Sequence, residues 1–136
     1  MPRSRSKSRS VSSAKTVRGP AIELPAEVRR AVDFALELKA HDVTVLDLRG
    51  ISTATDYFVI ASGNSDVQVR AIADHVVEEL KKEGTRAGHV EGVRSGRWAL
   101  LDYIDFIVHV FHPQARAFYQ LENLWGDAPR WEAPED

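Results

Sequence analysis

Histidines and carboxylates are the residues of this chain with the most obvious capacity for chemistry. His109 and His112 lie three positions apart at the end of one apolar run. On a strand this spacing points them to opposite faces, so they cannot share a metal ion without a bend. Asp56 is followed two positions later by Phe58, where a second carboxylate would be needed to bind a divalent cation. The chain has no cysteine, which excludes disulfides and thiolate chemistry. We therefore expect no metal ion and no cofactor.

A turn at Ser62 and Gly63 lies between an apolar run and a helical pattern, where a nucleophile or a phosphate site could form. A nucleophile elbow needs a G-x-S-x-G pattern, and Ile60 occupies the first glycine position. The turn could hold an anion at the helix N-terminus, but it lacks the lysine of a P-loop and the three glycines of a dinucleotide fold. A tight turn with Ser65 as helix cap explains the same residues. A nucleotide-binding or nucleotidyltransferase-like protein that uses this turn and Asp56 is the alternative hypothesis.

The segment 98–105 concentrates aromatic and apolar residues around two acids. Tryptophan and tyrosine are frequent anchors of protein–protein interfaces, which makes this segment a candidate binding surface. Trp98 and Leu100 could equally fill the core from alternate positions of a strand, and composition alone does not decide between the two. Asp102 and Asp105 would suit a basic partner.

Charge is divided unevenly along the 136 residues, whose formal net charge is −2. Residues 1–22 hold six basic residues and no acid, so they carry +6 and residues 23–136 carry −8. The basic segment has little apolar surface to bury and is expected to be disordered. It either has no specific role or contacts RNA nonspecifically. A transit peptide is disfavoured, because the segment lacks the apolar stripe of an amphipathic transit helix. The acidic remainder disfavours a nucleic-acid groove and favours a basic protein partner.

The sequence predicts three regions: a basic disordered tail at 1–21, a single domain at 22–128 and an acidic irregular tail at 129–136. It shows no secretory signal, and no apolar run approaches the roughly 18 residues needed to span a bilayer. We therefore expect a cytoplasmic protein without membrane contact.

Hydrophobic periodicity and turn residues predict the element order α-β-β-α-β-β-β-α. The helices are predicted from Pro25 to about residue 40, from a capping box at Ser65 and Gln68 to Gly84, and from Pro113 to Trp125. The strands are predicted at 43–48, 57–61, 86–90, 97–101 and 106–111, the last two as a hairpin. Helical crossovers combined with a hairpin indicate an α/β fold with a mixed sheet of about five strands covered by helices.

The order and spacing of motifs from about residue 24 to 128 resemble the ribosomal silencing factor family, also called Iojap-like. Each motif is weak alone, and their combination is specific. The motifs are Thr55–Gly63, Ser65, Gln68–Val69, Glu91–Gly92, Trp98, Leu100–Tyr103, Asp105, Val108–Phe111, Arg116, Phe118–Tyr119, Leu121–Glu122 and Leu124–Trp125.

This resemblance implies a function without catalysis. Proteins of this family bind the large ribosomal subunit through its fourteenth universal protein, at the face that meets the small subunit. They thereby block subunit joining and repress translation when nutrients are short. The implied fold resembles nucleotidyltransferases without their catalytic acids, and some members are homodimers when free.

The resemblance also implies which residues bind the partner. Carried over by position, they are Trp98, Leu100, Asp102, Tyr103 and Asp105, with Ser52 and Asp56 as further candidates. The chain departs from the family at Ile104, where glycine is usual. Because isoleucine does not readily adopt a positive φ, we expect a turn that is reshaped or that never needed positive φ.

Overall fold

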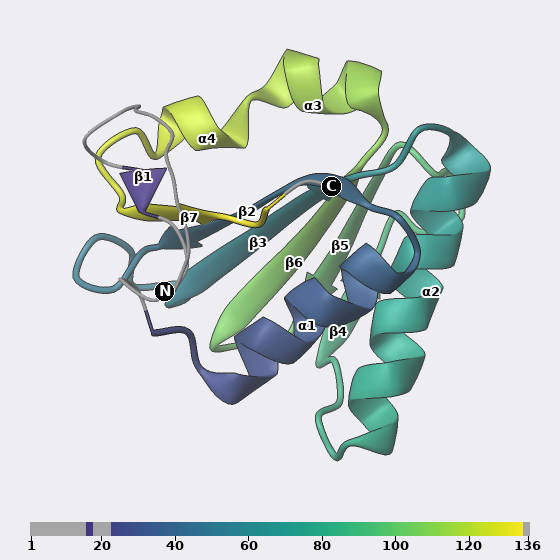
Figure 1. Cartoon of the computed structure of the whole chain (residues 1–136), viewed down its shortest axis with the longest axis horizontal. Helices are drawn as coiled ribbons and strands as arrows, with labels where there is room; N and C mark the ends of the chain where they lie inside the picture. Colours follow the sequence, from purple (N-terminus) through teal and green to yellow (C-terminus); the bar gives the residue numbers. More distant parts are fainter. Residues whose placement is uncertain (1–15, 18–22, 135–136) are drawn as a thin grey trace.

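The computed structural model describes residues 16–17 and 23–134, which form a single mixed sheet with helices on both faces (Figure 1). The helices are α1 (Ala26–Glu37), α2 (Asp66–Lys82), α3 (Pro113–Tyr119) and α4 (Leu121–Leu124). The strands are β1 (Thr16–Val17), β2 (His41–Asp47), β3 (Tyr57–Ser62), β4 (His89–Glu91), β5 (Trp98–Asp102), β6 (Phe106–Phe111) and β7 (Arg130–Glu132). Their order in the sheet is β1-β7-β2-β3-β6-β5-β4. No helix in these ranges is long and apolar enough to cross a membrane.

The predicted order of the central elements is confirmed, including the antiparallel β5–β6 hairpin. β3 and β6 pair in parallel, because the chain passes through α2 and the β4–β5 hairpin between them. The remaining pairs within β2–β6 are antiparallel, which makes the sheet mixed as expected.

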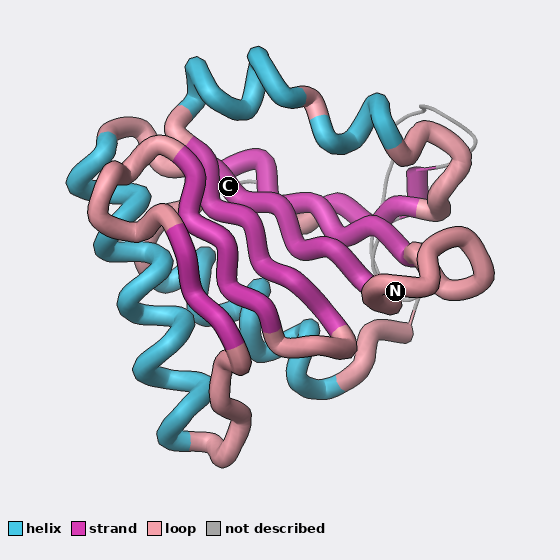
Figure 2. Tube along the Cα trace, turned by 180° about the vertical axis from the view of Figure 1, so that it is seen from behind, coloured by secondary structure: helices cyan, strands magenta, loops and turns pink. Residues whose placement is uncertain are grey.

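The two longer helices cover one face of the sheet, and the two short helices lie on the other. α1 and α2 lie in front of the strands in Figure 1, whereas α3 and α4 lie along the side of β2 and β7. Seen from behind, β4, β5 and β6 are not crossed by any described helix (Figure 2). On this side Leu100, Asp102 and Ile107 are partly exposed, whereas His109 and Phe111 of β6 are buried.

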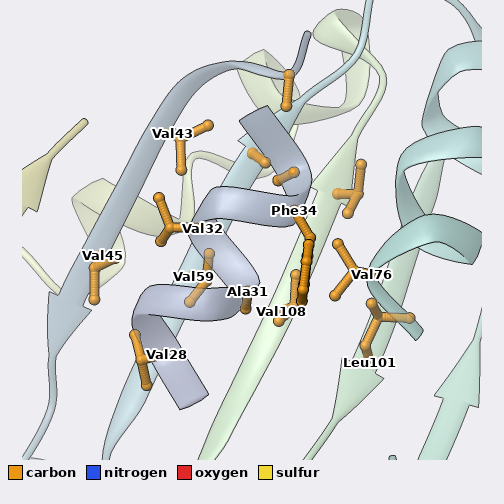
Figure 3. Packing of buried hydrophobic residues seen from close by; sticks show 14 of the residues in the cluster. Val28, Ala31, Val32, Phe34, Val43, Val45, Val59, Val76, Leu101 and Val108 are labelled. Atoms are coloured by element: carbon orange, nitrogen blue, oxygen red, sulfur yellow. The ribbon is translucent and has the colours of Figure 1, made fainter. Parts of the chain in front are cut away.

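The core lies between the sheet and the α1–α2 layer. Figure 3 shows Val32 and Phe34 of α1 beside Val59 and Val108 of the central strands, with Val76 of α2 at the other side. All five side chains are 3% exposed or less. Truncation of such residues typically costs about 2–5 kcal/mol, so this layer supplies much of the stability.

The start of α2 follows the predicted capping pattern with one difference. Ser65 Oγ accepts a hydrogen bond from the Gln68 backbone N–H at 3.1 Å, which caps the helix. The Gln68 side chain accepts from the backbone N–H of Asn64 rather than from that of Ser65. Its amide group also donates to the carbonyls of Leu38 and Lys39, and so ties the end of α1 to the start of α2.

The sheet has seven strands rather than about five, because short strands add to one edge. β7 pairs with β2, and β1 pairs with β7. The irregular tail predicted from residue 129 is therefore wrong at Arg130–Glu132. Trp131 is only 8% exposed and lies opposite Val45, so burial of its ring holds this segment in the sheet. β1 lies inside the tail predicted to be disordered, and the rest of that prediction concerns residues outside the described ranges.

The last predicted helix is two short helices. Gln120 has φ 47°, a left-handed conformation that ends α3, and its N–H donates to the carbonyl of Arg116. The prediction of one continuous helix is wrong because this local break is not visible in the apolar spacing. Leu124, predicted on the apolar side, is 71% exposed.

Candidate partner-binding surface

β5 directs the side chains of Trp98, Leu100 and Asp102 to the face that α1 and α2 do not cover. All three are partly exposed, and they alternate with Ala99 and Leu101, which are fully buried. This period of two is the property of a strand with one face on the core. Composition did not decide whether Trp98 and Leu100 belong to the core or to the surface. In the structure both side chains are partly buried and partly exposed.

Neighbouring strands extend this surface. Asp102 lies opposite Ile107 of β6, and Ile107 lies opposite Phe58 of β3, so their side chains share one face of the sheet. Ile107 and Phe58 are also partly exposed. Phe58 packs against Trp125 in the smaller core cluster, so we call only Leu100, Asp102 and Ile107 the open sheet face, and it lies on the side seen in Figure 2.

Trp98 is held in place by a buried histidine. Its indole N–H donates to His109 Nδ1 at 3.0 Å, and its ring stacks on Phe111 with centroids 5.1 Å apart. His109 is 4% exposed, and this burial lowers its pKa from 6.5 to about 4. The imidazole is therefore neutral at pH 7, as its role of acceptor requires. The bond joins two neighbouring strands, because Trp98 lies on β5 and His109 on β6.

The turn between β5 and β6 is a γ-turn centred on Ile104. The N–H of Asp105 donates to the carbonyl of Tyr103 at 2.9 Å, and Ile104 has φ 74°. Asp102 Oδ1 accepts from the Ile104 N–H at 2.8 Å. The expectation that this turn needs no positive φ is wrong, because Ile104 adopts one, whereas the expectation of a reshaped turn stays a prediction. Its hydrogen bonds hold the backbone there in spite of the β-branched side chain.

The loop between β2 and β3 is joined to this turn by two hydrogen bonds. The Thr55 hydroxyl donates to the Ile104 carbonyl at 3.0 Å, and the Asp56 N–H donates to the Asp105 carbonyl at 3.0 Å. Thr55 is only 5% exposed, so it is an internal tie. The sequence assigned Thr55 no role of its own, although Thr55 opens the first family motif at the end of a polar loop.

These contacts bring most of the candidate acids together. Asp56 and Asp105 are exposed and Asp102 is partly exposed. We call these three residues the acidic turn cluster. Ser52 is partly buried, and its Oγ accepts from the Ala54 N–H at 3.0 Å within the same loop. Ser52 therefore shapes the loop and offers little surface of its own.

Tyr103 does not lie on the surface with the other candidates. It is 7% exposed, and its ring stacks on Phe106 with centroids 4.8 Å apart. Burial also raises the pKa of its hydroxyl to about 12. Tyr103 belongs to the core on the α1–α2 side of the sheet, so it supports the turn from beneath.

Comparison with known proteins identifies the family. The family model described as ribosomal silencing factor during starvation matches residues 21–136. The chain belongs to the ribosomal silencing factor family. It is 47% identical to ribosomal silencing factor RsfS of Bacillus subtilis over 91 residues, which are 67% of this chain and 77% of that protein.

Other relatives widen this likeness. Identity to RsfS of Halalkalibacterium halodurans is 44%, covering 73% of this chain and 85% of that protein. Identity to the chloroplastic protein Iojap of Zea mays is 36%, over 75% of this chain and 44% of that longer protein. A crystal structure of a protein from Chromobacterium violaceum superposes with a TM-score of 0.74 at 33% identity, covering 77% of this chain and 88% of that one. The predicted mixed α/β fold is thus confirmed, whereas the likeness to nucleotidyltransferases stays a prediction.

The turn at Ser62 and Gly63, which the sequence offered as a nucleophile or phosphate site, has a structural role. Ser62 is 2% exposed, and its hydroxyl accepts from Arg116 at 2.8 Å. A Cβ on Gly63 would lie 3.1 Å from the Val69 backbone nitrogen, which explains the small residue in this tight turn. Ser65 caps α2. Across residues 16–17 and 23–134, no group of three or more histidines and acids is placed to hold a metal ion.

Proposed function

We propose that this protein is a cytoplasmic translation repressor that binds the large ribosomal subunit and sterically blocks joining of the small subunit. The partner is the fourteenth universal protein of the large subunit, at the face that meets the small subunit. The protein acts by occupying this face and performs no chemistry. The observation that carries the proposal is the acidic turn cluster beside the open sheet face, in a chain whose family is named for silencing ribosomes during starvation.

Charge supports a basic protein as the partner. Residues 23–136 carry a formal charge of −8, so the domain as a whole attracts basic surfaces. The acids of the turn cluster come from two segments that are 46 to 49 residues apart in sequence and are held together by one backbone hydrogen bond and by the Thr55 hydroxyl. Such a fixed arrangement would restrict partner choice and raise the association rate.

The open sheet face supplies the apolar part of the proposed contact. Leu100 and Ile107 offer partly exposed aliphatic surface, and Trp98 is oriented by His109 at the edge of this surface. Asp56, Asp102 and Asp105 lie at its end, and Ser52 shapes the adjoining loop. In this arrangement Tyr103 contributes by supporting the turn and not by direct contact.

A charge reversal tests the proposal without disturbing the core. Asp105→Lys changes an exposed side chain that makes no described ion pair, so the fold should persist. We expect its affinity for purified large subunits in cosedimentation to fall about tenfold, since a complementary charge becomes a like charge. Asp74→Lys, an equal charge change on an exposed residue of α2, is the matched control and should bind as the unmodified chain does.

A subunit-joining assay completes the test. Added protein should lower the yield of whole ribosomes formed from purified subunits, and Asp105→Lys should restore that yield. Equal binding by Asp105→Lys and Asp74→Lys would show that the site is wrong. Absence of any binding by the unmodified chain would refute the function itself. Trp98→Glu is a weaker test, because this change also breaks the bond to His109 and must be accompanied by circular dichroism.

Two further contacts are part of the proposal. The free protein forms a homodimer, which sedimentation equilibrium without ribosomes would detect. The basic tail at 1–21, most of which lies outside the described residues, contacts RNA nonspecifically. Each phosphate contact adds to the salt dependence of binding, so replacing the five basic residues before β1 by glutamine should flatten that dependence. An unchanged salt slope would contradict the RNA contact.

A further inference from the structure

Ile104 combines a strained backbone with an exposed apolar side chain. Its φ of 74° lies in a region that β-branched residues rarely adopt, because Cβ then crowds the backbone. Its side chain is also 72% exposed, the most exposed of the large hydrophobic residues described. Neither property favours folding, since the strain destabilises the turn and the exposed side chain buries little surface.

The turn does not need the isoleucine in order to form. Its conformation is fixed by main-chain bonds from Tyr103 to Phe106 and from Asp105 to Tyr103, and by the Thr55 hydroxyl on the Ile104 carbonyl. None of these bonds involves the side chain of residue 104, so a turn with glycine at this position would form all of them without strain. Strain that persists where the fold gains nothing from the side chain points to a function for that side chain.

The surroundings of Ile104 define what it fits. Asp102 and Asp105 flank it in sequence, and Asp56 is bound to the same turn through the Asp105 carbonyl. A second exposed isoleucine, Ile51, lies on the loop that Thr55 ties to this turn and is 46% exposed. An apolar tip beside three carboxylates complements an apolar recess bordered by lysine or arginine side chains.

We propose that Ile104 is an anchor of the docking surface and inserts into an apolar recess bordered by basic side chains on the partner protein. The inference rests on the proposed function, because the partner is the same basic protein of the large subunit. It deepens that function by assigning the central contact to a residue whose conformation the fold itself disfavours. The acids of the turn cluster then pair with the basic border of the recess.

The inference predicts opposite effects on stability and on binding. Ile104→Gly relieves the strain, as does Ile104→Asn, because asparagine tolerates the left-handed region. Both variants should melt about 3 °C higher than the unmodified chain. Both should bind purified large subunits at least about tenfold more weakly in cosedimentation, as expected for the loss of a buried anchor. A purely structural residue would not give this pair of opposite changes.

Two controls define the comparison. Ile104→Val keeps a β-branched apolar side chain, so its affinity should stay within about fourfold of the unmodified chain, as a lost methylene allows. Leu124→Asn removes an equally exposed side chain, 71%, from α4, which lies above the sheet in Figure 1 and away from this turn. It should leave binding unchanged.

The outcomes separate this inference from the proposed function. If Ile104→Gly binds like the unmodified chain while Asp105→Lys binds weakly, the function stands and the anchor is overturned. A lower melting temperature for Ile104→Gly would overturn the strain argument and the anchor with it. If the unmodified chain does not bind large subunits at all, the proposed function fails first.

Discussion

Mild acid should destabilise this protein through a single buried side chain, His109. The imidazole is 4% exposed and accepts the indole N–H of Trp98 on Nδ1. A proton on Nδ1 would both break this bond and place a charge among Phe58, Trp98 and Phe111. Burial therefore lowers the pKa of His109 from 6.5 to about 4 in the folded protein.

The size and sign of the effect follow from the two pKa values. Above pH 6.5 neither the folded nor the unfolded state binds this proton, so the stability is fully present. Between pH 6.5 and 4 only the unfolded state binds it, so the free energy of unfolding falls by about 1.4 kcal/mol per pH unit. Below pH 4 both states are protonated and the loss stops. The full loss is about 3 kcal/mol, a large part of the stability of an ordinary domain.

Urea unfolding at several pH values between 7 and 4.5 measures this effect. His109→Gln is the comparison, because its side-chain oxygen can accept the Trp98 N–H and it does not titrate. Between pH 6.5 and 5 the unmodified chain should lose about 2 kcal/mol more than the variant. The other four histidines and all acids are common to both chains and cancel in the difference. Parallel curves would refute the reasoning, since His109 would then titrate alike in both states.

Four further substitutions test the hydrogen bond from Thr55 to the turn, the close packing at Gly96 with Gly84 as its comparison, and the buried hydroxyl of Tyr103. Thr55→Val removes the hydroxyl donor to the β5–β6 turn and should lower the free energy of unfolding by about 1–2 kcal/mol in urea titration. Gly96→Ala should cost about 3 kcal/mol or more, because the new Cβ would lie within 2.7 Å of Asp66 backbone atoms at φ 71°. Gly84 also has a positive φ, but a Cβ there would meet no atom within 4 Å, so Gly84→Ala should cost only about 1 kcal/mol. Equal losses of stability in the two glycine variants would contradict the packing argument. Tyr103→Phe removes a buried hydroxyl without a partner among the described residues, and it should leave thermal stability unchanged or higher; a clear loss would reveal a bond for this hydroxyl.

The elements with strong local patterns could be predicted from the sequence. α2 has a cap at Ser65, an unbroken apolar face and Gly84 beyond its end, and these signals depend only on neighbours along the chain. β3 and β6 are apolar runs, as expected of central strands buried on both faces. The short strand β7 has no such pattern. Its place in the sheet depends on Trp131 finding Val45, which is 86 residues earlier in sequence.

The candidate surface could be predicted only in part. Strand alternation is regular, so the shared direction of Trp98, Leu100 and Asp102 follows once β5 is recognised. The same alternation puts Tyr103 on the buried side with Ala99 and Leu101, whereas its place among the partner-binding residues came only from the family resemblance. The contact between Asp56 and Asp105 depends on loop–loop hydrogen bonds between distant segments, for which sequence spacing carries no information.

The open sheet face has a simple origin in helix length. At about 1.5 Å per residue, the 17 residues of α2 span roughly 25 Å, whereas the seven residues of α3 and the four of α4 span roughly 10 and 6 Å. The short pair covers the β2–β3 side, where Leu46 and Ile60 are fully buried, and leaves Leu100 and Ile107 partly exposed. Longer helices after β6 would complete the core and remove the surface on which the proposed partner docks.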